Sequence, residues 1–107
     1  MRLFNASHLE VKKYFSGPFQ TNPYEAGWAS ECIFFIHVEE REGDPVLTAK
    51  VQLSHDGIHW CDEGTVSGEI REGLNFIRVR EFGNWLRLDC AVTGGAMKLN
   101  IQIACKE

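Results

Sequence analysis

The chain has 107 residues, of which 44% are hydrophobic and 24% are charged. These values are typical of one globular domain with a single core, and they exclude a coiled coil and a disordered chain. The formal net charge of −4 argues against nucleic acid as a partner, because phosphate binding requires a basic face. We therefore expect residues 1–107 to form a single domain.

The N-terminal residues contain no apolar stretch of the kind that a Sec signal peptide requires. No apolar run approaches the ~18 residues that a transmembrane helix needs. These observations predict a protein without a membrane partner, either cytoplasmic or associated with a virion.

Four cysteines are present, at Cys32, Cys61, Cys90 and Cys105. Three of them, at 32, 90 and 105, lie in apolar strand patterns, where cysteine serves as a small buried hydrophobe. In a reducing compartment these residues are expected to be structural thiols. Disulfides and metal ligation are the alternatives.

Residues 1–27 are predicted to provide a first strand or cap at 8–15 and then an irregular segment that wraps the domain. The signals for the irregular segment are two chain breaks, Ser-Gly-Pro at 16–18 and Thr-Asn-Pro at 21–23. A strand over 28–39 follows, with a period of two. Its centre, residues 32–36, is apolar on both faces, which predicts that both are covered, by the N-terminal segment or by another subunit.

The rest of the chain shows further alternating segments, separated by turn residues. A solvated turn is predicted at 39–45, and strands are predicted at 47–54, 58–62, 65–70, 74–80, 85–92 and 97–105. No segment has a helical period. The pattern predicts an all-β, antiparallel β-sandwich of about seven to nine short strands, with a jelly-roll topology.

The segment 54–60 reads Ser-His-Asp-Gly-Ile-His-Trp and is predicted to be a hairpin corner, because Asp-Gly favours a tight turn. It is also rich in side chains that can bind a metal ion. His55, His59 and Cys61 are the candidate ligands, although Gly57 favours a turn over the helix that would stack two histidines. A metal site is therefore an alternative to solvated turn histidines.

No segment combines a nucleophile with a base, and no glycine-rich phosphate loop lies between a strand and a helix. Each acidic residue is explained by a turn or by an outward strand position. The sequence therefore predicts a protein that is not an enzyme and that has no cofactor.

Aromatic and basic side chains at strand ends are the candidates for ligand binding. Trp28, Trp60 and Trp85 could stack on a sugar or anchor a protein partner, or they could simply close the ends of the core. Arg78, Arg80 and Arg87 point outward in the strand pattern and could contact an anionic ligand, or pair with acidic residues across the strands. The predicted ligand-binding residues are His59, Trp60, Trp85 and Arg87.

Three segments resemble the C-terminal half of discoidin-type (F5/8 type C) jelly rolls. They are the hairpin at 54–60, the strand Asn-Trp-Leu-Arg-Leu at 84–88, and the alternating strand Met-Lys-Leu-Asn-Ile-Gln-Ile at 97–103. Similar segments occur in small structural proteins of bacteria and phages. The resemblance covers about residues 47–105 and implies a sandwich that binds or assembles. It transfers no binding residue, because the family's binding loops lie in a half without a counterpart here.

The main functional hypothesis is a structural or assembly protein that forms a homo-oligomer or docks on a larger particle. The alternatives are a carbohydrate-binding module that uses exposed tryptophans, and a metal-binding protein that uses the His55, His59 and Cys61 cluster.

Overall fold

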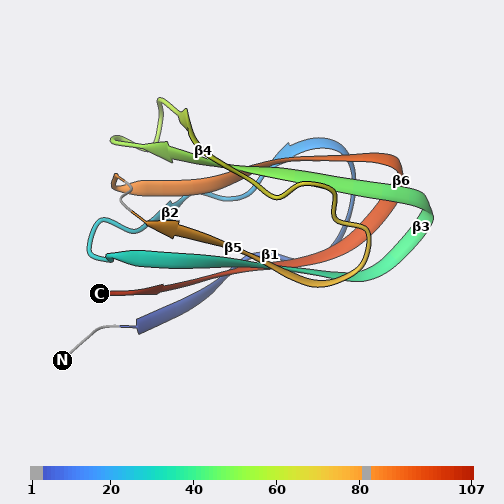
Figure 1. Ribbon diagram of the computed structural model, residues 1–107, viewed down its shortest axis with the longest axis horizontal. Coiled ribbons are helices and arrows are strands. Elements are labelled where there is room, and N and C mark those ends of the chain that lie inside the picture. Colours follow the sequence, from blue (N-terminus) through green and yellow to red (C-terminus); the bar gives the residue numbers. More distant parts are fainter. Residues whose placement is uncertain (1–3, 81–82) are drawn as a thin grey trace.

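The computed structural model describes residues 4–80 and 83–107, with side chains from residue 14 onward, and is a two-layered antiparallel β-sandwich (Figure 1). Its strands are β1 (Phe4–Gln20), β2 (Tyr24–Glu25), β3 (Glu31–Ser54), β4 (Cys61–Val66), β5 (Gly73–Arg80) and β6 (Trp85–Lys106). The all-β class and the antiparallel sandwich predicted from the sequence are confirmed. No helix able to cross a membrane occurs within these residues.

Three strands, β1, β3 and β6, pass through both layers. In layer 1 the strand order is β5, β3, β6, β1. Residues 31–38 of β3 pair with β5 on one side and with residues 99–106 of β6 on the other, and β6 pairs with β1. In layer 2, β4 pairs with the second arm of β3, which pairs with residues 85–93 of β6. The end of β1 and the short β2 complete layer 2 beside β6. If β1, β3 and β6 are each counted once in each layer, the described residues form nine strand segments. This number agrees with the predicted seven to nine.

The two long strands bend together from one layer into the other, at the right end of Figure 1. Gly43 of β3 lies opposite Gly95 of β6 at this bend. A Cβ on the neighbouring Gly94, which has a φ of +83°, would lie 2.5 Å from the carbonyl oxygen of Asp44. Side chains therefore do not fit where the bends of β3 and β6 cross. The turn predicted at 39–45 and the gap between the predicted strands 85–92 and 97–105 are bends within continuous strands, so the predicted flanking strands are joined.

The alternating pattern places the core as predicted. The inward residues of layer 2 are buried, as are those of layer 1, because period-two side chains from both layers point into the space between them. They include Leu86, Leu88, Cys90 and Val92 of the first β6 arm, Met97, Leu99, Ile101 and Ile103 of the second, and Phe34, Ile36 and Val38 of β3.

The N-terminal segment does not wrap the sandwich. Strand β1 continues through the predicted break at 16–18, with Gly17 at a φ of +80° where the register shifts. It adds to the edges of both layers beside β6 instead of covering a face. The irregular region is thereby confined to the chain around β2, between Gln20 and Glu31.

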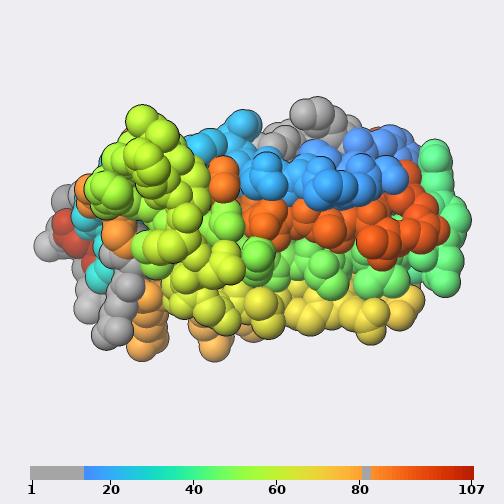
Figure 2. All heavy atoms as spheres, turned by 90° about the horizontal axis from the view of Figure 1, so that it is seen from above, coloured from blue at the N-terminus to red at the C-terminus, as the bar shows by residue number. Residues whose placement is uncertain are grey.

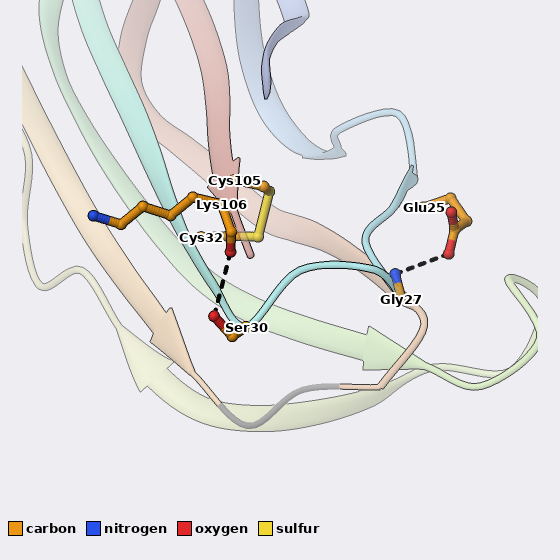
Figure 3. Close-up of a disulfide and its surroundings, with 6 residues drawn as sticks. All are labelled: Glu25, Gly27, Ser30, Cys32, Cys105 and Lys106. Atoms are coloured by element: carbon orange, nitrogen blue, oxygen red, sulfur yellow. Dashed lines mark hydrogen bonds between the residues drawn. A yellow bond between two sulfur atoms is a disulfide. The ribbon is translucent and has the colours of Figure 1, made fainter. Parts of the chain in front are cut away.

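A disulfide joins Cys32 to Cys105 (Figure 3). The two residues lie directly opposite each other in the β3 and β6 ladder, with their Cα atoms 4.1 Å apart. This corrects the expectation that Cys32 and Cys105 are structural thiols, and it realises the disulfide alternative. The pairing depends on a strand register between residues 73 positions apart. Neither the exposed Cys61 nor the buried Cys90 belongs to this bond.

Candidate functional site

The hairpin at 54–60 is organised by the hydroxyl group of Ser54, which is buried at the end of β3. Ser54 Oγ accepts the backbone N–H groups of Asp56, at 3.2 Å, and Gly57, at 2.8 Å. It also lies 3.0 Å from Asp56 Oδ1, to which it donates. The predicted corner is therefore built by side-chain bonds to its own backbone.

Asp56 completes this turn. Its Oδ1 accepts the backbone N–H groups of Ile58 and His59, both at 2.8 Å, and its Oδ2 lies 2.7 Å from Nδ1 of His59. The backbone N–H of His59 is the largest cause that lowers the pKa of Asp56 well below its usual range, followed by the His59 side chain and the N–H of Ile58. The carboxylate is thus a structural group of the turn.

The structure does not bring the three predicted metal ligands together. The nitrogens of His55 and His59 lie 3.6 and 2.7 Å from the same Asp56 oxygen, whereas Cys61 is in β4, with its sulfur 3.8 Å from the carbonyl oxygen of Leu53. Among the residues that the structure describes, no three histidine, cysteine or acidic side chains form a group that could hold a metal ion. The described geometry therefore does not support a metal site formed by His55, His59 and Cys61, and the hairpin uses the Asp56 carboxylate for its own backbone.

The three tryptophans are partly buried and in contact with other groups, so none is an open stacking platform. Arg87 lies over Trp60, with its Cζ 4.2 Å from the ring centroid. Trp85 packs against the backbone of Gly57, and Trp28 packs on the core. Nevertheless the predicted binding residues all lie on or beside the hairpin at one end of layer 2; they are His59, Trp60, Trp85 and Arg87. The strand register places them there, because Gln52 pairs with Arg87 and Ser54 with Trp85.

From Arg87 a row of polar side chains follows the outer face of layer 2. Arg87 Nε donates to Gln52 Oε1 at 2.8 Å, and Gln52 Nε2 donates to Asp62 Oδ1 at 3.0 Å. Lys50 Nζ lies 3.3 Å from Asp62 and 3.7 Å from Asp89. The hydrogen bond from Gln52 and the ammonium group of Lys50 lower the pKa of Asp62. These contacts hold the row in a fixed arrangement of charges.

The row leads into a hollow of about 440 Å³. It is lined by Pro18 of β1, Thr48, Ala49 and Lys50 of β3, Val66 and Gly68 at the end of β4, and Asp89, Cys90 and Ala91 of β6. Figure 2 looks onto this face, where the blue, orange-red and green strands lie side by side and the yellow-green β4 region stands beside them. Sequence reasoning missed the hollow, whose only signal is the small outward Ala91 opposite Thr48.

The outer face of layer 1 carries a group of neighbouring apolar side chains. Ile33 and Phe35 of β3 are partly exposed there, beside Phe76 and Leu74 of β5, of which 57% and 67% are exposed. A depression of about 170 Å³ is lined by Ile33, Phe35, Ala104, Glu31 and Lys106. We call Ile33, Phe35, Leu74, Phe76 and Ala104 the layer 1 patch. Ile33 and Phe35 form the outward face of the strand that the sequence predicted to be apolar on both sides.

No protein-family model matches the chain, and no curated protein matches it. Solved structures do. YomS, a protein derived from the SPBc2 prophage, superposes with a TM-score of 0.70 over 100% of this chain and 96% of its own, at 6% identity. An F5/8 type C domain from Bacteroides fragilis gives 0.55 over 92% of this chain and 90% of its own, at 10% identity.

The fold is a discoidin-like jelly roll. The resemblance predicted for residues 47–105 is thus confirmed for the fold, and it extends over nearly the whole chain. A third similar structure is the C-terminal domain of A223, a structural protein from Sulfolobus turreted icosahedral virus, with a TM-score of 0.51 over 92% of this chain and 96% of its own, at 6% identity. At these identities the likeness establishes the shared fold and leaves the function to be argued from the surfaces.

Proposed function

We propose that this protein is a non-enzymatic structural protein of a virion-like particle that assembles with further copies of itself through the layer 1 patch. The observation that carries the proposal is the exposure of Phe76 and Leu74 next to Ile33 and Phe35, on a strand face with an apolar centre. A contiguous apolar surface of this kind is typical of a protein interface.

Two features of layer 1 support this. Strand β1 lies in the plane of the layer beside β6, so it does not cover the patch, which leaves the second predicted cover, another subunit. Charged groups border the apolar centre: Glu31 lies 3.0 Å from Lys106 Nζ and 3.6 Å from an Arg80 nitrogen. An apolar centre with a polar rim is the usual anatomy of an interface.

The fold also supports a structural role, because two similar structures come from a prophage and from Sulfolobus turreted icosahedral virus, and the viral one is named a structural protein. A role without catalysis is supported by the acidic side chains of layer 2. Asp56, Asp62 and Asp89 are each engaged in turn or cross-strand hydrogen bonds.

Size-exclusion chromatography with light scattering tests the proposal. The wild-type protein is expected to form an oligomer whose mass falls on dilution, and Phe76→Lys is expected to shift it to a monomer. The matched control is Ile58→Lys, since Ile58 is 74% exposed but lies on the hairpin, outside the patch. A wild-type protein that stays monomeric at millimolar concentration, or equal effects of the two variants, would refute assembly through this patch.

A further inference from the structure

The guanidinium group of Arg87 is held in place without an ion pair from the residues that the structure describes. The group lies over Trp60 and its Nε bonds to Gln52. Among the residues that the structure describes, no carboxylate forms an ion pair with Arg87, whereas the neighbouring Lys50 has two. A stacked and tethered guanidinium loses little conformational freedom on binding, and its remaining N–H groups suit the two oxygens of a carboxylate.

The strand register connects this arginine to the hollow. Arg87, Asp89 and Ala91 are successive outward residues of β6, opposite Gln52, Lys50 and Thr48 of β3. Because alternate residues of a strand are about 7 Å apart, the row from Arg87 to Ala91 is about 14 Å long. This length exceeds one sugar ring, so a saccharide that contacts both ends has more than one ring.

The lining of the hollow has two chemical characters. Pro18, Val66 and Ala91 provide apolar surface, and Lys50, Asp89 and Thr48 provide a charged donor, a charged acceptor and a hydroxyl group. A pyranose ring has the matching characters, with C–H groups on its faces and hydroxyl groups that both donate and accept at its edge. The volume of about 440 Å³ is within the usual range of small-ligand sites.

We propose that the outer strip of layer 2 that runs along β6 from Trp60 and Arg87 to the hollow at Ala91, here called the layer 2 strip, binds an acidic oligosaccharide. A neutral sugar ring occupies the hollow, where its hydroxyl groups bond to Lys50 and Asp89. The carboxylate of an adjacent acidic sugar pairs with Arg87. The carboxylates of Asp62 and Asp89 disfavour a densely charged polyanion, so the ligand carries acidic sugars spaced by neutral ones.

The test is calorimetric titration with tetrasaccharides of hyaluronan and chondroitin, in which uronate and neutral sugars alternate, beside the same compounds with their carboxyl groups reduced to alcohols. Tryptophan fluorescence provides a second signal, because the Trp60 ring lies against Arg87. Inorganic phosphate is titrated separately, to identify a simple anion site. We expect at least one uronate tetrasaccharide to bind, and its reduced form to bind about tenfold more weakly or worse.

Three variants locate the site. Arg87→Gln is expected to weaken binding about tenfold or more, and Ala91→Phe, which fills the hollow, is expected to abolish it. Arg78→Gln is the matched control, because Arg78 also lies over an aromatic ring, with its Cζ 5.1 Å from the centroid of Phe76, but on the other layer. Arg87→Lys separates loss of charge from loss of the guanidinium shape, and thermal unfolding checks that each variant is folded.

Several results would overturn the proposal: no binding by either tetrasaccharide, equal binding of the reduced forms, phosphate binding at Arg87 as tight as that of the oligosaccharide, or equal losses in Arg87→Gln and Arg78→Gln. Because the layer 2 strip and the layer 1 patch are on opposite faces, Phe76→Lys is expected to bind the oligosaccharide normally. The proposal therefore stands or fails independently of self-assembly.

Discussion

The backbone of Gly57 lies against the indole ring of Trp85: a Cβ added to Gly57 would be 3.2 Å from Trp85 Cε2. Gly57 also has a φ of +80°. Two separate constraints, a left-handed backbone and a ring in contact, therefore require glycine at the corner of the hairpin.

Substitution at Gly73 separates these two constraints. Gly73 has a φ of +77°, but nothing lies within 4 Å of its added Cβ. Gly73→Ala is expected to lower the free energy of unfolding by about 1 kcal/mol, from backbone strain alone. Gly57→Ala is expected to lower it by about 2 to 3 kcal/mol, because the Trp85 ring must also move. Urea unfolding measures both, and equal losses would show that the ring contact is unimportant.

The bend between the layers provides a second pair of variants. A Cβ on Gly95 would collide with the carbonyl oxygen of Glu42, whereas a Cβ on Gly17, at the β1 bend, meets nothing within 4 Å. Gly95→Ala is expected to cost about 3 kcal/mol or more, because backbone cannot yield as a side chain can. Gly17→Ala is expected to cost about 1 kcal/mol. Urea unfolding measures the loss of stability in both variants. A mild effect of Gly95→Ala would argue against a close crossing of β3 and β6.

The disulfide between Cys32 and Cys105 is expected to stabilise the fold, because it closes a loop across a sequence separation of 73 residues. Reduction, or Cys32→Ala, should lower the free energy of unfolding by about 3 to 4 kcal/mol. Cys61→Ser, at the exposed cysteine, should leave it unchanged. Two reactive thiols in the denatured, unreduced protein are expected from a thiol assay, and four would show that the bond is absent.

Asp56 makes stability depend on acid pH. Its pKa is lower in the folded protein than in the unfolded chain, because the N–H groups of His59 and Ile58 bond to the charged form. The native state therefore binds fewer protons, and the stability that Asp56 contributes is lost as the pH falls below about 4. We expect Asp56→Asn to be less stable than wild type at neutral pH, with the two converging at low pH. Parallel curves in chemical denaturation from pH 2 to 7 would contradict this.

The sequence predicts the faces of the strands better than their ends. Burial of Leu86, Leu88 and Val92 follows from alternation alone, because a period of two decides which side chains point inward. The ends of the strands were harder to predict, because glycine and proline occur both where a chain reverses in a turn and where a continuous strand bends. Gly43 and Gly95 therefore read as turns, although they lie in continuous strands.

The features of the candidate site that the sequence missed depend on pairing across the chain. The disulfide and the hollow both depend on the register of β3 against β6, which places Cys32 opposite Cys105 and Thr48 opposite Ala91. Local pattern does not specify that register. The hairpin was predictable because Ser54, Asp56 and Gly57 act on their immediate neighbours.

Because β3 and β6 each run through both layers, the sandwich is one folded-over ribbon and not two sheets joined by loops. Neither layer has a complete set of strands of its own, so neither can open while the other keeps its hydrogen bonds. Slow amide hydrogen exchange in both layers should then proceed through a single global opening, with local fraying confined to β2, β4 and the hairpin. Such a unit transmits a pull on one face directly to the other, which suits a building block held between neighbours.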